Sequence, residues 1–585
     1  MERGGSFIVQ KMDENEIFTV EKFSDEQREI ADLISQFGKE QILPKRKDIE
    51  KYDKELSVGL MRQLGELGLL SVDVPEEYDG LGMDKVTSAI IAEKVVMGES
   101  ASFTVTFSAH TGIGTLPIVF FGTEEQKKKY LPKLGSGEWI GAYALTEPNS
   151  GSDALAAKST AVLSEDGKYY ILNGTKQFIS NGSWCDMMIA YTQVDGDKFT
   201  AFLIEMDMPG VEVGPEEVKM GLKGSSTTSI IFNNAKIPVE NVLGIVGKGH
   251  HIAFNILNIG RYKLGASDLG GCKVTINESV AYAMERHQFG QAISNFDSIK
   301  SKFANMIVRT FEQESILYRM VKNIDTSIKQ VKLEDKNYYK KIVAAIEEFA
   351  IEASMAKIVG SEHLWLNADD GLQIFGGYGF TEDYPLAGIT RDTRVDRIFE
   401  GTNEINRQIV TGYFLKKALT EELPIREKIK EVKKLLAGET PQIKSDVLPE
   451  EKKAYEYAKA VTLYLFNESI IKYGQGLKNE QQLMEILADS FTDLYIMDSV
   501  LRRITQNEKR DQDWLAIGKV STAIRVRRIA GSAKVALLSI LDGDELEKAL
   551  EDLAQLSKGT ELRNNLFALK RQLAESLYDK GEYVW

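Results

Sequence analysis

The sequence predicts a mainly α-helical protein with a central β domain, and three observations support this fold class. Apolar residues recur at helical spacing from Ser24 to about Phe121, and again from Ile252 to about Ala418. Between these regions lie short β-branched and aromatic segments that are separated by turns, as in an all-β unit. A chain of 585 residues also exceeds the roughly 250 to 300 residues at which one core stops growing. We therefore expect several domains.

Periodicity and composition divide the chain into six segments. We expect a mobile, polar, glycine-bearing arm and a helical domain, then a β domain, a second helical domain, a charged connector and a last helical block. Their limits are 1–20, 21–142, 143–247, 248–418, 419–450 and 451–585. Within the β domain, Asn173 and Gly174 separate two alternating runs, which predicts a two-residue hairpin turn because both positions tolerate positive φ.

Composition excludes several classes of function. Apolar residues make up 43% and charged residues 27% of the chain, which is typical of a soluble globular protein. The formal net charge of −15 argues against general nucleic-acid binding. Two cysteines and five histidines show no metal-ligand spacing, so no metal site is expected. Neither a secretory signal nor a run of about 18 apolar residues is evident, which favours a cytoplasmic protein.

Glu400 is the candidate general base. It lies at the end of a loop, because Gly401 and Thr402 have the form of a turn and cap before an amphipathic helix. Neighbouring apolar residues suggest burial, which raises a carboxyl pKa, whereas nearby arginines and a helix N-terminus lower it. A base with a pKa near neutrality is one outcome. A structural ion pair with Arg394 or Arg397 is the other, and this stretch alone does not decide between them.

Two further motifs lie at the edge of and within the β domain. The loop YALTEPNSGSDA, residues 143–154, offers backbone N–H groups and short hydroxyls to a polar ligand, or is only an interdomain turn. In TKQFISNGSW, Phe178 and Ser180 alternate along a strand and so face the same side. An aromatic plane beside a hydroxyl suits a flat heterocycle, although Phe178 as an ordinary core residue is the alternative.

Two more motifs lie in the second helical domain. In YAMERHQFGQAISNF, Arg286 stands one turn before a helix break and can offer a forked cation to a phosphate, unless it is a simple surface arginine. The glycine-rich stretch from Gln373 to Gly379 lacks the spacing and strand context of a Rossmann loop. Any dinucleotide bound here is therefore held in another way.

These four motifs and IFEGTNEI, in their order and spacing, resemble the acyl-CoA dehydrogenase family of flavoenzymes over residues 25–415. The segments ILNIGR, RHQFGQ and IFEGTN and the additional C-terminal block are most similar to the very-long-chain branch of this family. The resemblance implies a helical domain, a β-barrel or sandwich domain and a helical bundle, plus an extra C-terminal helical domain. It also implies FAD as cofactor.

The resemblance further implies a role for individual residues. Glu400 matches the catalytic base, since Gly260 occupies the position where some members carry it. The residues implied to contact FAD are Tyr143, Thr146, Ser152, Phe178, Ser180, Arg286, Gln288, Phe289, Gln373, Gly376, Gly377, Thr402 and Glu404. The residues implied to contact substrate are Ser152, Asn258, Arg261 and Gly401. The resemblance also implies a homodimer, because FAD bound by a neighbouring subunit would be contacted by Arg286, Gln288, Phe289 and residues Gln373 to Gly377. Family members often have tryptophan where this chain has Phe178.

The implied reaction is α,β-dehydrogenation of a fatty acyl-CoA in β-oxidation. Glu400 would take a proton from the carbon beside the thioester carbonyl while a hydride leaves the next carbon for flavin N5, giving a trans-2-enoyl-CoA. Electron-transferring flavoprotein would then accept the electrons. Two alternatives stay open at this point: an acyl-CoA oxidase that uses oxygen, and a non-catalytic scaffold of the same fold.

Two segments carry more specific expectations. Residues 102–115 match the family's wall at the far end of the acyl channel, and their small residues predict room for a long chain, unless they only let two helices approach closely. The small or short side chains in question are Val105, Ser108, Ala109, Gly112 and Gly114. In the C-terminal block, Arg525, Arg527 and Arg528 lie among apolar residues and would suit an anionic membrane surface, or an ordinary solvated or interdomain face.

Overall fold

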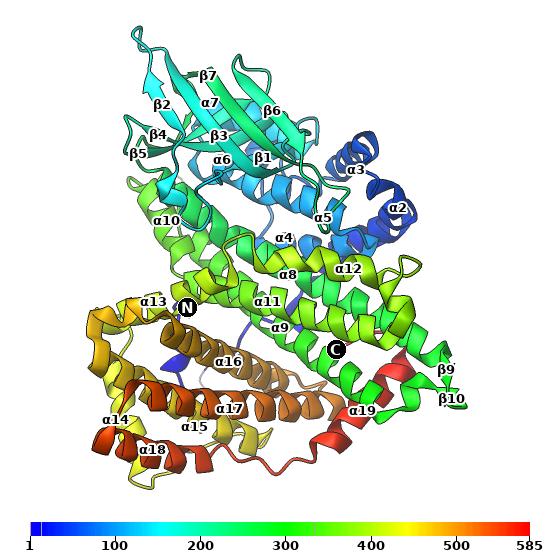
Figure 1. The fold of residues 1–585 in the computed structure, drawn as a ribbon, viewed down its shortest axis with the longest axis vertical. Helices are drawn as coiled ribbons and strands as arrows, with labels where there is room; N and C mark the ends of the chain where they lie inside the picture. Colours follow the sequence, from blue (N-terminus) through cyan, green and yellow to red (C-terminus); the bar gives the residue numbers. More distant parts are fainter. Residues whose placement is uncertain (1, 13–14, 333) are drawn as a thin grey trace.

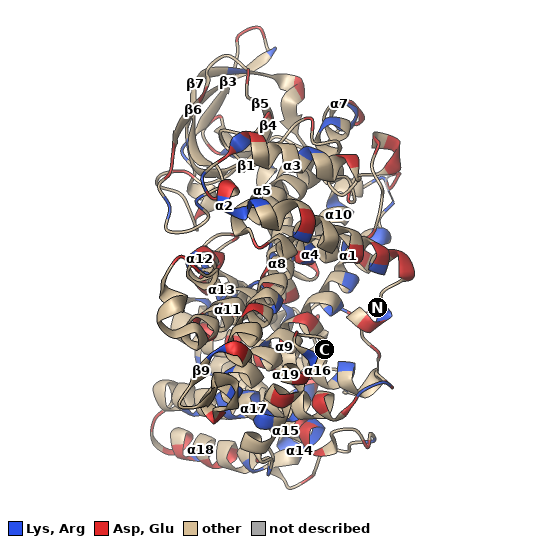
Figure 2. Ribbon diagram, turned by 90° about the vertical axis from the view of Figure 1, so that its right-hand side faces the viewer, with Lys and Arg blue, Asp and Glu red and all other residues tan. Residues whose placement is uncertain are grey.

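The computed structural model describes residues 2–12, 15–332 and 334–585, and confirms the predicted fold class (Figure 1). A β domain lies at one end of the elongated molecule and the C-terminal helices lie at the other. The long helices of the third domain, α8, α9 and α11, run between them. Figure 2 shows that acidic and basic residues are intermixed along the chain.

The N-terminal domain is helical because its apolar residues recur with helical period and its helices have good caps. Ser24 and Thr123 each form a capping box with a glutamine three residues later, which fixes the starts of two helices. The helices are α1 (Asp25–Phe37), α2 (Arg46–Ile49), α3 (Lys54–Glu66), α4 (Lys85–Lys94), α5 (Ala101–Ser108), α6 (Leu116–Phe121) and α7 (Glu124–Gly135). A π-helical segment, Ala109–Gly114, joins α5 to α6.

One stretch of this domain corrects an expectation about apolar runs. Ala101–Phe121 has a mean hydropathy of 1.2 over 18 residues and is long and apolar enough to span a bilayer, although no such run was predicted. In the fold, 83% of that window is buried. Such burial is what a core helix shows, and this segment forms one wall of the cavity described below.

The β domain is one sheet with the strand order β6-β7-β3-β2-β4-β5-β8, and β1 pairs in parallel with β4. Its strands are β1 (Gly141–Ala144), β2 (Thr160–Leu163), β3 (Tyr169–Ser180), β4 (Met187–Val194), β5 (Lys198–Glu205), β6 (Val211–Glu216), β7 (Thr227–Pro238) and β8 (Val242–Leu243). The strands β1 and β3 carry the two motifs that were assigned to a cofactor.

The predicted hairpin at Asn173 and Gly174 is wrong. Both residues lie inside the continuous strand β3, where the register against β7 shifts between Leu172 and Gly174. Gly174 has φ +144°, and a Cβ there would come within 2.3 Å of the Ser159 hydroxyl oxygen. Gly174 therefore permits a β-bulge and a close approach of the backbone to Ser159. An Asn-Gly pair can serve either a bulge or a hairpin turn, and the local sequence does not show which of the two it forms.

The third domain is a bundle built on α8, a helix of 37 residues. It contains α8 (Gly249–Glu285), α9 (Asp297–Lys329), α10 (Tyr338–Glu347), α11 (Ala350–Phe375), α12 (Leu386–Thr393) and α13 (Asn403–Leu419), with a small ribbon of β9 (His287–Gln288) and β10 (Gln291–Ala292) after α8. The ribbon lies far from the β domain (Figure 1).

The C-terminal block is helical, as predicted, and the connector before it also contains a helix. The helices are α14 (Ile425–Leu436), α15 (Pro449–Tyr473), α16 (Gln481–Gln506), α17 (Gln512–Ile540), α18 (Gly543–Lys558) and α19 (Leu566–Lys580). One continuous apolar core joins this block to the third domain, since Phe414 of α13 packs on Phe491 of α16 with ring centroids 4.1 Å apart. The block is therefore integrated into the fold.

The expectation of a mobile N-terminal arm is wrong for its described residues, while residues 1 and 13–14 lie outside the described part. Phe7 and Ile8 are buried between the third and C-terminal domains. The backbone N–H of Gly5 donates to Glu352 Oε1 at 2.6 Å, and Glu2 pairs with the buried Arg319. The arm carries too few apolar residues to show a period, so its packing depends on partners elsewhere in the chain.

The membrane-surface interpretation of the arginines in α17 is also wrong for Arg525. Arg525 is buried and pairs with Glu312 of α9 and with Asp493 of α16. Arg528 Nε lies 2.5 Å from Asp493 Oδ2. Arg525 therefore joins helices of two domains, which confirms the interdomain alternative for this residue. The pair of Arg528 lies within the C-terminal block, and Arg527 and Arg528 are both exposed.

Candidate functional site

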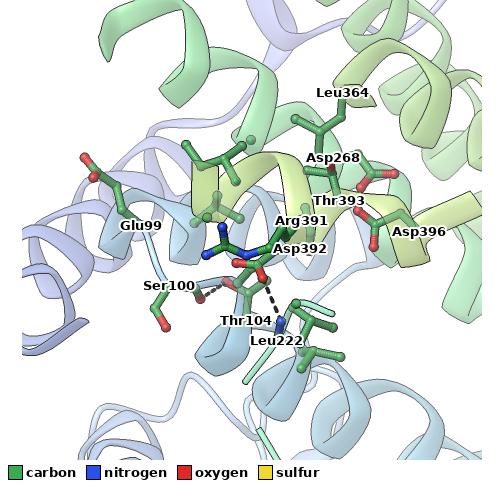
Figure 3. Close-up of a pocket in the computed structure, with 18 of the residues that line it drawn as sticks. Glu99, Ser100, Thr104, Leu222, Asp268, Leu364, Arg391, Asp392, Thr393 and Asp396 are labelled. Atoms are coloured by element: carbon green, nitrogen blue, oxygen red, sulfur yellow. Dashed lines mark hydrogen bonds between the residues drawn. The ribbon is translucent and has the colours of Figure 1, made fainter. Parts of the chain in front are cut away.

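A cavity of about 680 Å³ lies between the N-terminal domain and the third domain. One wall is α8, whose lining residues run from Gly260 to Val274, and the facing wall is α5 with the π-helical segment, from Ala101 to Ile113. Figure 3 shows α12 residues closing a further side, with the Asp392 carboxylate accepting the Leu222 N–H at 2.6 Å. Glu400 and Ser180 also line the cavity, so it joins the β domain to the predicted base.

Glu400 occupies a loop of unusual backbone conformation. Its φ is +56°, which is uncommon for a residue with a side chain. The Arg261 Nε donates to the Glu400 carbonyl oxygen at 3.2 Å, and the Thr402 hydroxyl caps α13 by accepting the Ile405 N–H. Strain of this kind persists only where surrounding contacts impose it, and it is concentrated at functional sites.

The carboxyl group of Glu400 has the environment of a general base. Its Oε2 atom is enclosed and has no hydrogen-bond partner among the residues that the structure describes. Burial raises the pKa of Glu400 to about 7, against the opposing charges of Arg261 and Lys357. Arg397 Nη2 lies 3.8 Å from Glu362 Oε1 and not beside Glu400. The described contacts therefore do not support a structural ion pair between Glu400 and Arg397.

Gly260 makes room for this carboxyl group. A Cβ at that position of α8 would lie 2.6 Å from Glu400 Oε2 and 3.0 Å from Cδ. Any larger residue would push the Glu400 side chain aside. Gly260 was noted in the sequence only because glycine cannot serve as a base, and in the fold it leaves the space that the Glu400 carboxyl group occupies.

Several charged residues near Glu400 were not singled out in the sequence. Lys357 of α11 donates to the Gly401 carbonyl oxygen at 2.8 Å and to Asn403 Oδ1 at 2.6 Å, and burial lowers the pKa of Lys357 to about 8. Figure 3 shows Asp268 and Asp396 close together in the cavity wall, and burial raises the pKa of both carboxyl groups. A lysine on the apolar face of a helix was the available signal for Lys357, whereas the aspartate pair forms only when distant elements meet.

The first group of predicted cofactor residues lies together beside the cavity. Tyr143 is buried on β1, its hydroxyl donates to the Ala253 carbonyl oxygen, and the nearby charge of Glu400 adds to the burial that raises its pKa. The Thr146 carbonyl oxygen accepts the N–H of Gln177, beside Phe178. Phe178 has φ +57° and is 62% exposed, so it is not an ordinary core residue. Ser152 is exposed on the following turn.

The second group lies at the other end of α8. Arg286, Gln288 and Phe289 follow the last turn of this helix, and Phe289 is 94% exposed. Tyr282 stacks on Phe375 with centroids 4.0 Å apart, which brings Gln373, Gly376 and Gly377 to the same end. The 26 residues between Gly260 and Arg286 span about 39 Å of helix. Within one chain, the two groups are therefore far apart.

The remaining predicted residues surround the backbone of the base. Arg261 Nη1 donates to Asn258 Oδ1 at 2.7 Å, and a Cβ on Gly401 would lie 3.5 Å from Arg261 Nη2. Asn258, Arg261 and Gly401 lie behind the Glu400 loop and are not among the residues that line the cavity. Their contact with substrate therefore stays a prediction. Glu404 is exposed in the first turn of α13.

Comparisons with known proteins agree with this arrangement. Family models described as acyl-CoA dehydrogenase N-terminal, middle and C-terminal domains match residues 24–138, 142–235 and 247–413. A separate model, also described as an acyl-CoA dehydrogenase C-terminal domain, matches residues 457–555. The matches therefore extend over all four folded parts of the chain.

Individual relatives cover most or all of the sequence. A probable acyl-CoA dehydrogenase of Bacillus subtilis (strain 168) is 44% identical over 100% of this chain and 99% of its own length. The mitochondrial very long-chain specific acyl-CoA dehydrogenase of Macaca fascicularis is 36% identical over 82% of this chain and 74% of its own. A crystal structure of an acyl-CoA dehydrogenase complexed with FAD from Bacillus anthracis is 42% identical, with a TM-score of 0.95 and full coverage of both chains.

Proposed function

Because the chain belongs to the acyl-CoA dehydrogenase family of FAD-dependent oxidoreductases, we propose that Glu400 is the base that removes the α-proton of a long-chain acyl-CoA. The observation that carries this proposal is the enclosed Oε2 atom of Glu400 in the cavity wall, which has no partner among the described residues. With a pKa of about 7, this carboxylate is ionised in a large fraction of molecules at neutral pH and can accept a proton there.

The residues beside the cavity fit the FAD cofactor of the family. Phe178 offers an exposed aromatic ring next to Ser180, whose side chain borders the same cavity as Glu400. Such a ring and hydroxyl suit a flat heterocycle that needs one apolar face and one hydrogen-bond partner. Tyr143, Thr146 and Ser152 would continue this contact, with Thr402 and Glu404 on the side of the base. When bound, FAD supplies the acceptor for the hydride.

The chain's own groups perform the proton transfer and hold the base in place. Gly260 leaves the space in which the Glu400 carboxylate sits, and Arg261 holds the carbonyl oxygen of the same residue. The cavity excludes bulk water from the carboxylate, which keeps its pKa high enough for it to be an effective base. Asn258 and Gly401 would complete the substrate side of this loop.

A long acyl chain is the substrate that best suits the shape of the cavity. Its lining on α8 extends from Gly260 to Val274, which is about 21 Å of helix. Val105, Ser108 and Ala109 line the opposite wall, whereas Gly112 faces Lys263 and Gly114 packs closely against Gly141. Each buried methylene contributes about 0.8 kcal/mol, so a chain that fills this length should bind more tightly than a short one.

The experiment is anaerobic addition of acyl-CoA substrates of increasing length to the FAD-loaded protein, followed by flavin absorbance and product analysis. Palmitoyl-CoA should bleach the flavin more efficiently than octanoyl-CoA or butyryl-CoA and yield the trans-2-enoyl-CoA. Ala109→Phe should move the preference toward the shorter substrates. A preference of the wild type for butyryl-CoA would contradict the long-chain proposal and leave the role of Glu400 intact.

Two chains are needed to bring both groups of cofactor residues to one FAD. Arg286, Gln288, Phe289, Gln373, Gly376 and Gly377 lie about 39 Å along α8 from the base, so we assign them to FAD bound mainly by a second subunit. Isologous pairing of two chains would then complete two equivalent sites. A monomer in solution that retains tightly bound FAD would contradict this assignment.

We assign reoxidation to electron-transferring flavoprotein, in a cytoplasmic pathway of fatty-acid β-oxidation. The resemblance to acyl-CoA dehydrogenases supports this choice over an oxidase. Turnover in air should produce little hydrogen peroxide and should accelerate when electron-transferring flavoprotein is added. Rapid peroxide formation without such acceleration would instead identify an oxidase.

A further inference from the structure

We propose that Asp489, in the C-terminal domain, is a positioning residue that holds Lys357 beside Glu400. This inference rests on the proposed role of Glu400 as the base. It gives the C-terminal domain a part in the reaction, although none of its residues lines the cavity.

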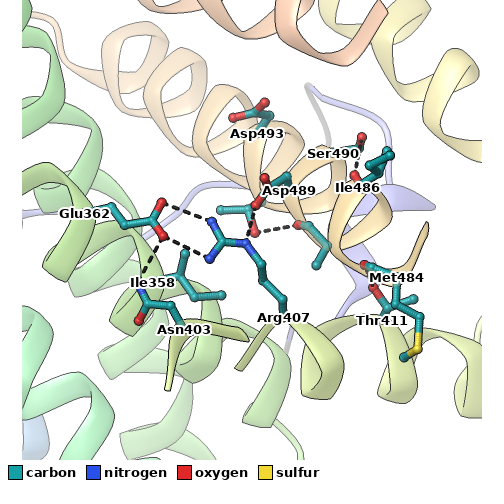
Figure 4. A network of polar contacts seen from close by, with 12 residues as sticks. Ile358, Glu362, Asn403, Arg407, Thr411, Met484, Ile486, Asp489, Ser490 and Asp493 are labelled. Carbon is teal, nitrogen blue, oxygen red and sulfur yellow. Dashed lines mark hydrogen bonds and ion pairs between the residues drawn. The ribbon is translucent and has the colours of Figure 1, made fainter. Parts of the chain in front are cut away.

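The connection begins at the interface between α13 and α16, which Figure 4 shows. Arg407 of α13 lies between two carboxylates: its Nε donates to Asp489 Oδ1 at 2.8 Å, and its Nη1 lies 2.9 Å from Glu362 Oε1. A second bond from Arg407 Nη2 to Glu362 Oε2, at 3.1 Å, makes this pair bidentate. A planar guanidinium with two such partners has one preferred orientation.

The connection continues from Glu362 to the loop of the base. Glu362 Oε1 accepts the Asn403 Nδ2 donor at 3.0 Å, and Asn403 Oδ1 accepts Lys357 Nζ at 2.6 Å. The same ammonium group donates to the Gly401 carbonyl oxygen at 2.8 Å. Five side chains from α11, α13 and α16 thus form an unbroken series of polar contacts from the C-terminal domain to the residue that follows Glu400.

The consequence for the base is electrostatic. Lys357 is one of two cations that lower the pKa of Glu400 against the effect of burial. If Lys357 moves away, the pKa of Glu400 rises and less of the base is ionised at neutral pH. The other titratable groups around this pair are Arg261 and Tyr143 beside Glu400, and Asp268, Asp396 and Arg261 beside Lys357.

The test is the pH profile of flavin reduction by palmitoyl-CoA in the Asp489→Ala enzyme. Arg407 would lose one of its two anchors, so kcat near pH 7 should fall about three- to tenfold. The acid limb should move to higher pH while KM stays within about twofold, because Asp489 is remote from the cavity. Above the pKa of Lys357, about 8, Lys357 loses its charge, so the two enzymes should converge.

Three further variants make the outcome decisive. Asp489→Glu should restore the wild-type profile, and Asp489→Asn, which keeps the shape but not the charge, should give an intermediate shift if the alanine variant does not fold. Asp297→Asn removes the half-exposed pair with Arg571, which also joins the third domain to the C-terminal block, and should change neither kcat nor the profile. An unchanged profile in folded Asp489→Ala and Asp489→Asn enzymes would overturn the inference.

The failure of this inference can be distinguished from a failure of the proposed function. If Glu400→Gln reduces its flavin normally, the assignment of the base is wrong. If Glu400→Gln is inactive while both Asp489 variants behave as wild type, the base stands and only its connection to the C-terminal domain is rejected.

Discussion

Asp498, at the interface with the C-terminal domain, and Glu400, in the cavity, are both buried carboxyl groups, but their pKa values are shifted in opposite directions. At the interface, Asp498 Oδ2 lies 2.7 Å from Arg319 Nη1 and 2.9 Å from Arg502 Nε. Burial raises the pKa of Asp498, but these two cations outweigh it and the pKa is lowered overall. In the cavity, burial raises the pKa of Glu400 and of Asp392 to about 7.

The comparison shows that burial alone does not identify a functional carboxylate. Both groups are enclosed, yet only Asp498 has cations within hydrogen-bond distance of its side-chain oxygens, whereas Glu400 Oε2 has no hydrogen-bond partner among the described residues. An ion-paired carboxylate stabilises the fold and gives up its capacity to take a proton near neutral pH. A carboxylate left without such a partner costs stability and keeps that capacity, which is the property that a base needs.

The largest effect should come from breaking the interface cluster. Asp498→Ala leaves two buried guanidinium groups without this anion, and should lower the free energy of unfolding by about 3–5 kcal/mol at pH 7. Because the pKa of Asp498 is lowered in the fold, its contribution is present above the ordinary carboxyl pKa and disappears as pH falls below about 4. Urea unfolding at pH 7 and at about pH 3 measures both effects: the loss should be smaller at the lower pH, and an equal loss at the two pH values would contradict the charge-based explanation.

For Glu400 in the cavity, the stability of the protein should depend on pH in the opposite direction. The pKa of Glu400 is raised from an ordinary value of 4.5 to about 7, so the folded state keeps a proton that the unfolded state has released between these values. Stability therefore falls as pH rises through this window. Glu400→Gln should be more stable than the wild type by up to about 3 kcal/mol at pH 8 and equally stable near pH 4. A Glu400→Gln variant that is less stable than the wild type at pH 8 would contradict the raised pKa of Glu400.

A smaller effect should follow from filling the space beside the base. Gly260→Ala places a methyl group within 2.6 Å of Glu400 Oε2, and displacement of the carboxyl group should reduce the rate of flavin reduction by about 10- to 100-fold. Gly412→Ala on α13 is the matched control, because a Cβ there meets nothing within 4 Å. That control should keep full activity, and normal activity of the Gly260 variant would mean that the carboxyl is not confined.

Local patterns in the sequence were sufficient to predict the helical and β segments and to single out Glu400 as the candidate base. Glu400 stood out because its loop, the Thr402 cap and the following helix are contiguous, and the structure confirms that cap. The capping boxes at Ser24 and Thr123 are local signals of the same kind. Such features depend on a few neighbouring residues, which is why sequence alone can show them.

The features that were missed depend on residues from separate elements. Lys357 on α11 meets the Glu400 loop only through the packing of the bundle, and Asp268 on α8 meets Asp396 in the same way. The N-terminal segment was predicted to be mobile because it is polar and glycine-bearing, yet its Phe7 and Ile8 fill a site formed by distant helices. At Asn173 and Gly174, a bulge and a hairpin turn require the same residues, and only strand pairing separates them.

The rate of flavin reduction in Glu400→Gln is the most direct test of the central claim. The amide keeps the shape of the side chain but cannot accept the α-proton, so the variant should retain FAD, bind palmitoyl-CoA and reduce its flavin about 10²- to 10⁴-fold more slowly than the wild type. Stopped-flow absorbance of the anaerobic enzyme measures this rate in a single turnover. Reduction at nearly the wild-type rate would contradict the assignment of Glu400 as the base.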